Sequence, residues 1–157
     1  MIFVTLGSQK FQFNRLLIEI DRLIEEKKIT EEVFAQIGYS DYKPRNYEYK
    51  EFLDRDRFAD VMNMSDKVIT HGGTGAIIGA VKNGKKVIAV PRLYEYQEHV
   101  DNHQIQLINE FKELNFIEAA YEIDELEEAI DNIKIKKYNK YISNTRKIID
   151  SIESFIE

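Results

Sequence analysis

Short apolar runs alternate with amphipathic stretches along the whole chain. The apolar and β-branched runs predict six strands, at 2–6, 33–38, 47–52, 67–70, 86–90 and 115–119. The stretches between and after them repeat their apolar residues at helical spacing, which predicts helices at 14–28, 54–64, 76–81, 98–113 and from 124. Asn14 is expected to cap the first helix. Strands that alternate with helices predict a single α/β domain, Rossmann-like and doubly wound, with a mostly parallel six-stranded sheet.

The most informative stretch runs from Lys67 to Gln104. A short strand stops at His71-Gly72-Gly73-Thr74-Gly75, and a helix follows. Glycine lets the backbone approach a ligand closely, and the first N–H groups of a helix have no partner inside it, so an anion such as phosphate fits there. The spacing of Gly73, Gly75 and Gly79 is near the dinucleotide fingerprint without matching it, and it lies halfway along the chain instead of in the first βα turn.

A second polar cluster, residues 98–104, follows the next strand. Because the carboxyl ends of neighbouring parallel strands meet at one edge of a sheet, we expect this cluster to lie near the glycine turn. One interpretation is a metal site, because His99 and His103 are four residues apart with Asp101 between them. It lacks the glutamate of the metalloprotease motif and has no obvious third ligand. A plain structural role for His103 and Gln104 at the helix start is also open.

The stretches at 4–9, 71–75, 86–91 and 102–104 together resemble the C-terminal, donor-binding domain of family 28 glycosyltransferases. More closely, they are similar to its free-standing form, the Alg13-like subunit and its bacterial PssE-type counterparts. The resemblance covers nearly the whole chain and implies that 1–157 is one half of a GT-B-type enzyme. It implies inverting transfer from a UDP-sugar to a lipid-linked saccharide, in exopolysaccharide or capsule biosynthesis.

The resemblance also implies a set of site residues, and it requires no metal or other cofactor. The donor diphosphate would lie against Gly7, Ser8, Gly72, Gly73, Thr74 and Gly75, the sugar and ribose against Glu98, His99, Asn102 and Gln104, and the nucleobase against Phe52 and Leu53. The carboxylate, imidazole and amide groups of the second set can donate to and accept from sugar hydroxyls. The sequence departs from the family at Gly79, where relatives carry a glutamate that holds the ribose; Glu98 or another side chain would then take that role. His71 either contacts phosphate or the partner, or only holds the glycine loop, and it is also a possible catalytic residue of this chain.

The general base and the acceptor site would belong to an Alg14/PssD-like, membrane-associated partner, which would hold the cytoplasmic chain at the inner face of the membrane. The apolar stripe at 138–156 predicts a last helix whose outer end could dock that partner, and a homodimer of the isolated chain is also open. The basic cluster Lys134, Lys136, Lys137 and Lys140 is interpreted either as solvated surface or as a contact to anionic lipid.

Composition narrows the classes of function. The 157 residues, 43% of them hydrophobic, suffice for one domain with a core, and a net charge of −6 gives no general attraction for nucleic acid. The absence of cysteine excludes disulfides, thiol catalysis and zinc–thiolate sites. No signal peptide and no bilayer-length apolar run is expected. The alternative is a stand-alone nucleotide- or dinucleotide-binding regulatory module, against which the acidic residue expected after a second strand is not clearly in place.

Overall fold

The computed structural model describes residues 1–141 and residue 150. Its strands are β1 (Ile2–Thr5), β2 (Val33–Gln36), β3 (Glu48–Lys50), β4 (Lys67–His71), β5 (Lys86–Val90) and β6 (Glu118–Ala119). They form one sheet in the order β3-β2-β1-β4-β5-β6, and every neighbouring pair is parallel. The predicted α/β fold with six strands is therefore confirmed, and the sheet of the described residues is wholly parallel.

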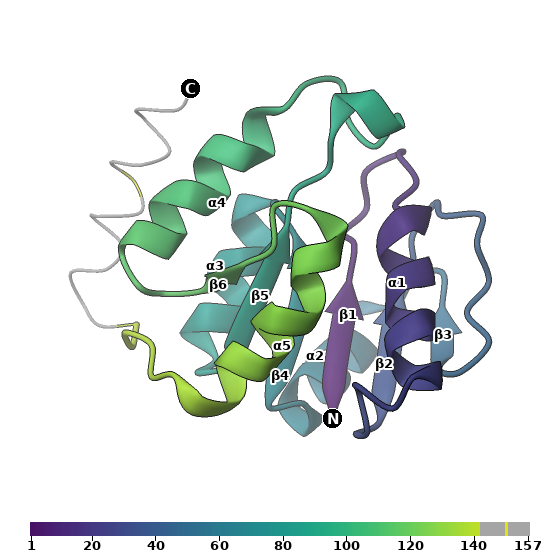
Figure 1. Ribbon diagram of the computed structural model, residues 1–157, viewed down its shortest axis with the longest axis horizontal. Coiled ribbons are helices and arrows are strands. Elements are labelled where there is room, and N and C mark those ends of the chain that lie inside the picture. The colour runs from purple at the N-terminus through teal and green to yellow at the C-terminus, as the bar shows by residue number, and fades with distance from the viewer. Residues whose placement is uncertain (142–149, 151–157) are drawn as a thin grey trace.

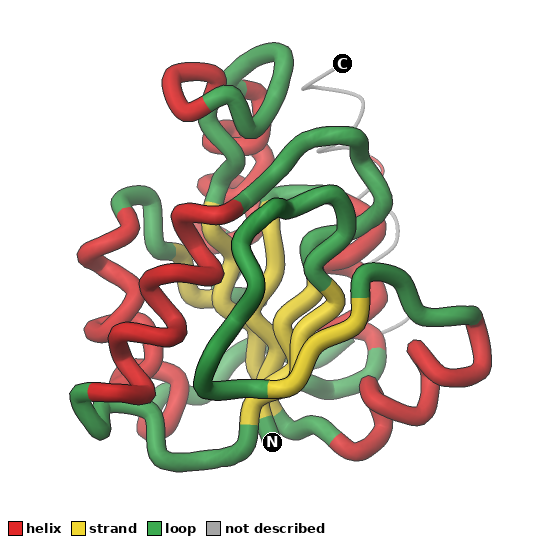
Figure 2. The backbone as a smooth tube through the Cα atoms, turned by 90° about the vertical axis from the view of Figure 1, so that its right-hand side faces the viewer, coloured by secondary structure: helices red, strands yellow, loops and turns green. Residues whose placement is uncertain are grey.

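Five α-helices and two short 3-10 helices connect and cover the strands (Figure 1). The α-helices are α1 (Asn14–Glu25), α2 (Arg55–Met64), α3 (Thr74–Lys82), α4 (His103–Glu113) and α5 (Leu126–Ile135), and the 3-10 helices are η1 (Tyr94–Tyr96) and η2 (Ile123–Glu125). Helices α1 and α5 lie on one face of the sheet, and α2 and α3 lie on the other (Figure 1). Figure 2 shows the sheet between its two helical layers.

The strands divide the core into two clusters because successive side chains point to opposite faces of a sheet. Ile2 and Val4 of β1 pack with the apolar sides of α1 and α5, whereas Phe3 between them packs with α2, α3 and α4. The central strands β1, β4 and β5 are apolar on both faces, as expected for strands covered by helices on each side.

The strand order reverses at β1, which lies between β2 and β4. Thr5 of β1 is in register with Thr70 of β4, so both strands end at the same level of the sheet. In open parallel sheets, the crevice between the loops that leave two such strands is the usual ligand site. The loop after β1 and the glycine turn after β4 therefore lie on either side of this expected ligand position, which we call the crevice.

Two details of the predicted helices are wrong. Asn14 does not cap α1: its Oδ1 accepts the backbone N–H groups of Asp41 and Tyr42, and the N-cap is Phe13. The predicted helix 98–113 begins only at His103. Gln97, with φ of 59°, ends η1, and residues 98–102 follow as a non-helical segment in which Asn102 accepts the backbone N–H of Tyr94.

The predicted helix 138–156 does not begin at Tyr138, because residues 136–141 have no regular secondary structure. The rest of that prediction, apart from Asp150, lies outside the described residues. Tyr138 and Tyr141 pack against the edges of the two core clusters instead of forming a helical stripe. Across the described part of the chain, no helix combines the length and the apolar character that crossing a bilayer requires.

Candidate functional site

The loop after β1 and the amino end of α3 both expose backbone groups at the crevice. Gly7, just after β1, has φ of +71°, a conformation that residues with a side chain rarely adopt. Ser8 beyond it is exposed. Across the crevice, Gly73 is the N-cap of α3, and no side chain among the described residues caps this helix. The first N–H groups of α3 are therefore open to an anion.

His71 fills the space between Gly7 and Gly73. A Cβ on Gly7 would lie 2.7 Å from His71 Nε2, and a Cβ on Gly73 would overlap the same ring at Cε1. Both glycines are therefore required by the fold itself, because the imidazole occupies the place of their missing side chains. His71 is only 5% exposed.

Gln104 of α4 holds the glycine turn from the other side. Its Oε1 accepts the backbone N–H of Gly72 at 2.9 Å and that of Arg92 at 3.0 Å. These two N–H donors fix the orientation of the amide, so its Nε2 must be the group that faces His71 Nδ1, at 3.3 Å. Gln104 is buried, and its oxygen is already shared by two donors in this structure.

This amide also fixes the protonation of His71. Because Gln104 Nε2 donates to Nδ1, the ring proton of the neutral imidazole is on Nε2, beside Gly7. Burial, reinforced by the positive charges of Arg92 and His99, lowers the pKa of His71 from 6.5 to about 3. His71 is therefore neutral at pH 7, and its N–H donor, not a basic nitrogen, lies beside Gly7.

Arg92 lies under the loop that follows β1. Its guanidinium donates to the carbonyl oxygens of Leu6 at 2.6 Å, Phe11 at 3.0 Å and Gln12 at 3.2 Å. Burial lowers its pKa to about 10, an effect that Glu98 partly offsets, so it stays charged at pH 7. This fixed cation braces the loop and adds positive potential to the crevice.

Glu98 is completely buried and pairs with Arg15, with both contacts at 3.0 Å. Its Oε1 also accepts the backbone N–H of Leu93 at 3.0 Å. In this conformation the carboxylate closes the 92–98 loop onto α1 and does not face the crevice. Arg15 and Arg92 were not singled out by the sequence, because an isolated arginine carries no pattern that tells a buried cation from a solvated one.

Asn102 and His99 lie in the loop between η1 and α4. Asn102 accepts the N–H of Tyr94 at 2.9 Å and donates to Glu95 at 2.8 Å, which lowers the Glu95 pKa. His99 stacks on Phe11, with ring centroids 5.8 Å apart, so this loop meets the loop after β1. A cavity of about 440 Å³ lies between them.

The helical spacing assumed for a metal site is absent, because His99 precedes α4 and only His103 belongs to it. Within residues 1–141 and at 150, no group of three or more histidine, aspartate or glutamate side chains lies close enough together to hold a metal ion.

The predicted nucleobase residues lie two strands away from β1. Phe52, in the loop after β3, is 47% exposed and packs edge-to-face on Tyr39, with centroids 5.2 Å apart. Leu53 is half-buried, and its N–H donates to Gln36 Oε1 at 3.3 Å. Tyr39 was not singled out by the sequence, although an aromatic residue directly after Gly38 is a usable signal. Together these rings form an apolar platform at the carboxyl ends of β2 and β3.

Comparison with known proteins supplies the family. The model of the glycosyltransferase family 28 C-terminal domain matches residues 1–156, nearly the whole chain. The chain belongs to this family. The resemblance to the donor-binding domain of family 28 glycosyltransferases is therefore confirmed.

Individual relatives agree with the family. The UDP-N-acetylglucosamine transferase subunit ALG13 of Candida albicans is 29% identical over 85 residues, which cover 54% of this chain and 27% of the relative. The chain thus matches about a quarter of that relative's length. An NMR solution structure of ALG13 superposes with a TM-score of 0.64 and 18% identity, covering 97% of this chain and 96% of that chain. The crystal structure of Acinetobacter baumannii MurG superposes with a TM-score of 0.59 and 14% identity, covering 96% of this chain and 49% of that chain. These two likenesses show the fold.

Proposed function

We propose that this family 28 domain is the donor-binding subunit of a heteromeric inverting glycosyltransferase that uses a UDP-sugar. The observation that carries the proposal is the crevice at the strand-order reversal. There the uncapped amino end of α3 faces a left-handed glycine at Gly7, and His71 presents an N–H between them. Backbone N–H groups, one imidazole N–H and the buried Arg92 together suit a diphosphate.

The diphosphate would lie over Ser8 and the first turn of α3. Gly75, in that turn, is exposed and has no other part of the protein within 4 Å of where a Cβ would be. Helix dipole and N–H groups would stabilise the nucleoside diphosphate as negative charge develops on departure. Such a site needs no metal, and the donor would bind in the presence of a chelator.

The nucleobase would stack near the platform of Tyr39 and Phe52, and the sugar would enter the cavity that Phe11, His99 and the loop after η1 line. His99 and Asn102 are the polar side chains nearest that cavity among those predicted to meet the sugar. Gln104 and Glu98 would act mainly by holding the loops in position, because both are buried and bonded to protein groups.

His71 would bind phosphate and would not act as the general base. Its Nδ1 faces the Gln104 amide and its Nε2 carries the proton, so neither nitrogen is free to accept one from an acceptor hydroxyl. We therefore place the base and the acceptor site on an Alg14/PssD-like, membrane-associated partner. The acceptor would be a lipid-linked saccharide of an exopolysaccharide or capsule pathway, and the chain would act at the cytoplasmic face of the membrane.

Calorimetric titration tests the donor site. We expect UDP and UDP-N-acetylglucosamine to bind the purified chain in the presence of EDTA, and NAD not to bind. Gly75→Asp places a carboxylate at the proposed phosphate position and should abolish binding without unfolding the chain. The matched control is Asn63→Asp, which adds the same charge at an exposed position near the end of α2 and should leave binding intact.

Two outcomes would contradict the donor site: binding of NAD in place of UDP, or UDP binding that Gly75→Asp leaves unchanged. Activity tests the heteromeric part separately. The isolated chain should transfer no sugar, and transfer should appear when a membrane-associated partner of the same polysaccharide pathway is added. Full transfer by the chain alone would overturn the need for a partner and leave the donor site standing.

A further inference from the structure

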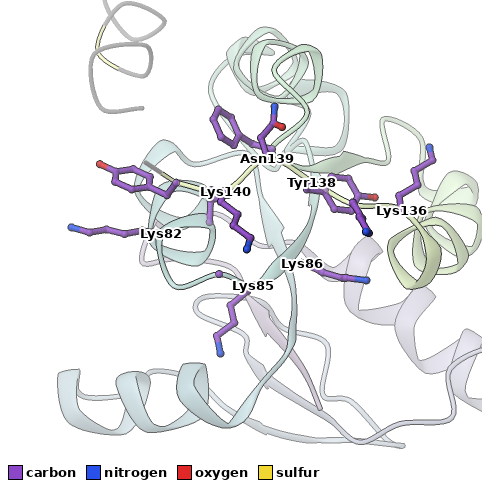
Figure 3. A pocket seen from close by; sticks show the side chains of 12 residues that line it. Lys82, Lys85, Lys86, Lys136, Tyr138, Asn139 and Lys140 are labelled. Carbon is purple, nitrogen blue, oxygen red and sulfur yellow. The ribbon is translucent and has the colours of Figure 1, made fainter. Parts of the chain in front are cut away.

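A groove lies at the amino end of β5, at the opposite end of the strands from the crevice. Its volume is about 580 Å³, within the range of small-molecule sites. Six lysines line it: Lys82, Lys85, Lys86, Lys136, Lys137 and Lys140. We call it the lysine groove. Three of these lysines come from the end of α3 and the start of β5, and three come from residues 136–141 (Figure 3).

The groove is fixed by hydrogen bonds before any ligand arrives. Residues 136–141, which we call the strap, are tied to the turn after α4. Asn139 N–H donates to Asn115 O at 2.8 Å, its Nδ2 donates to Leu114 O at 2.7 Å, and Asn115 Nδ2 donates to Lys137 O at 3.2 Å. The backbone of the strap is therefore anchored beside the groove, and its exposed lysine side chains extend from this fixed position.

The positive charge of the groove is mostly uncompensated. No aspartate or glutamate lines it within the described residues. Lys136 approaches Glu118 at 3.7 Å, but Glu118 also accepts from Tyr138 at 2.7 Å. Lys85, Lys86, Lys137 and Lys140 form no ion pair in the described part of the chain. Six of the 22 basic residues thus gather at one groove of a chain whose net charge is −6.

Apolar groups form the rest of the lining. Val81 and Phe116 are buried at its base, and the rings of Tyr138 and Tyr141 stand in the strap. Lys82 Nζ lies 5.9 Å from the Tyr141 ring centroid. Lysine binds phosphate as a mobile point charge, and aromatic walls accept an apolar group beside it. The chemistry that this combination favours is a phosphate-bearing organic anion.

We propose that the lysine groove is a second anion site, which binds the phosphate group of a ligand other than the sugar donor. It lies at the amino end of β5, whereas the donor crevice lies beyond the carboxyl ends of the strands. The phosphate can belong to a soluble organic phosphate or to the headgroup of an anionic lipid. Both sources offer the same group to the same lysines.

Site-resolved NMR of the whole chain separates the groove from the donor crevice. Inorganic pyrophosphate is titrated while the amide signals of Gly84 and Asn139 report the groove and those of Gly73 and Gly75 report the crevice. In parallel, the chain is sedimented with phosphatidylglycerol vesicles and with phosphatidylcholine vesicles. The test variant is Lys85→Gln/Lys137→Gln, and the matched control is Lys27→Gln/Lys28→Gln, which removes the same charge from two adjacent exposed lysines after α1.

We expect saturable shifts at Gly84 and Asn139, weakened about tenfold in the test variant and unchanged in the control. This result identifies a soluble phosphate as the source. Sedimentation with phosphatidylglycerol alone, lost in the test variant, identifies a lipid headgroup. The proposal is overturned if neither probe reaches the groove, or if the control variant loses binding as much as the test variant. Shifts confined to Gly73 and Gly75 would overturn it and leave the donor site standing.

Discussion

The glycine turn after β4 has two halves with different reasons for being glycine. Gly72 and Gly73 are crowded by the protein: a Cβ on Gly72 would lie 2.7 Å from Gln104 Cβ, and one on Gly73 would overlap the His71 ring. Gly75 and Gly79, further along the same segment, have open space where a Cβ would be. Packing inside the domain explains the first pair and does not explain Gly75, the position where the proposed diphosphate would lie.

This difference teaches how such motifs should be interpreted. A run of glycines in a sequence combines positions that neighbouring side chains require with positions that a ligand requires. Gly73 is crowded by His71, whose ring also occupies the place of a side chain at Gly7, whereas Gly72 is crowded by Gln104. Substitutions at His71 and at the glycines should therefore distinguish the glycines that packing requires from those that it does not.

The largest effect should come from pH, through His71. Its pKa is about 3 in the folded chain against an ordinary value of 6.5, so the unfolded chain binds the proton more strongly. The stabilisation is complete above about pH 6.5 and should fall by about 1.4 kcal/mol per pH unit as the pH drops toward 3. Urea unfolding at pH 7, 6 and 5 measures this slope.

The control for that slope is His71→Asn, which keeps a polar side chain and removes the titration. Carboxylates titrate in both proteins, so the difference between the two slopes belongs to the imidazole. Equal slopes would mean that His71 is not held neutral between the glycines.

The next effect is expected from Gly73→Ala. Its new methyl group would press on the His71 ring, and overpacking of this kind typically costs about 1–3 kcal/mol in the free energy of unfolding. Denaturant unfolding measures the loss. In a His71→Asn background the clash is relieved, and the same alanine should cost less. A cost that does not depend on residue 71 would contradict the crowding.

The smallest effect is expected from Gly79→Ala, in the interior of α3. The site has room for a methyl group and lacks a positive φ, so alanine should raise the free energy of unfolding by about 0.5–1 kcal/mol. Thermal unfolding measures this gain. A destabilised variant would show that Gly79, like Gly73, is required by the fold.

Much of the fold could be predicted because its signals are local. The β-branched runs of β1, β4 and β5 and the helical periodicity of α1 are each visible within a few residues, and the strands and helices alternate in a simple order. The start of α4 could not be predicted. Residues 98–102 have the polar composition of a helix start, but Glu98 pairs with Arg15, 83 positions earlier, and Asn102 accepts the backbone N–H of Tyr94.

The sequence predicted which segments form the candidate site, but not the role of each residue in it. The glycine turn and Gln104 were singled out, but the sequence could not say that Gln104 holds Gly72 and Arg92 together. That role depends on the register between β4, β5 and α4. The role of Arg92 could not be predicted for the same reason, since the carbonyl groups that it binds belong to residues about 80 positions earlier.

Strand β5 runs from the lysine groove toward the crevice. It begins at Lys86, which lines the groove, and ends at Val90, just before Arg92. Five residues in extended conformation place those two ends roughly 13 Å apart. The screening length at physiological ionic strength is about 8 Å, so two anions bound at opposite ends of this strand would repel each other only weakly. The domain could therefore bind both ligands simultaneously, and the length of β5 would set the distance between them.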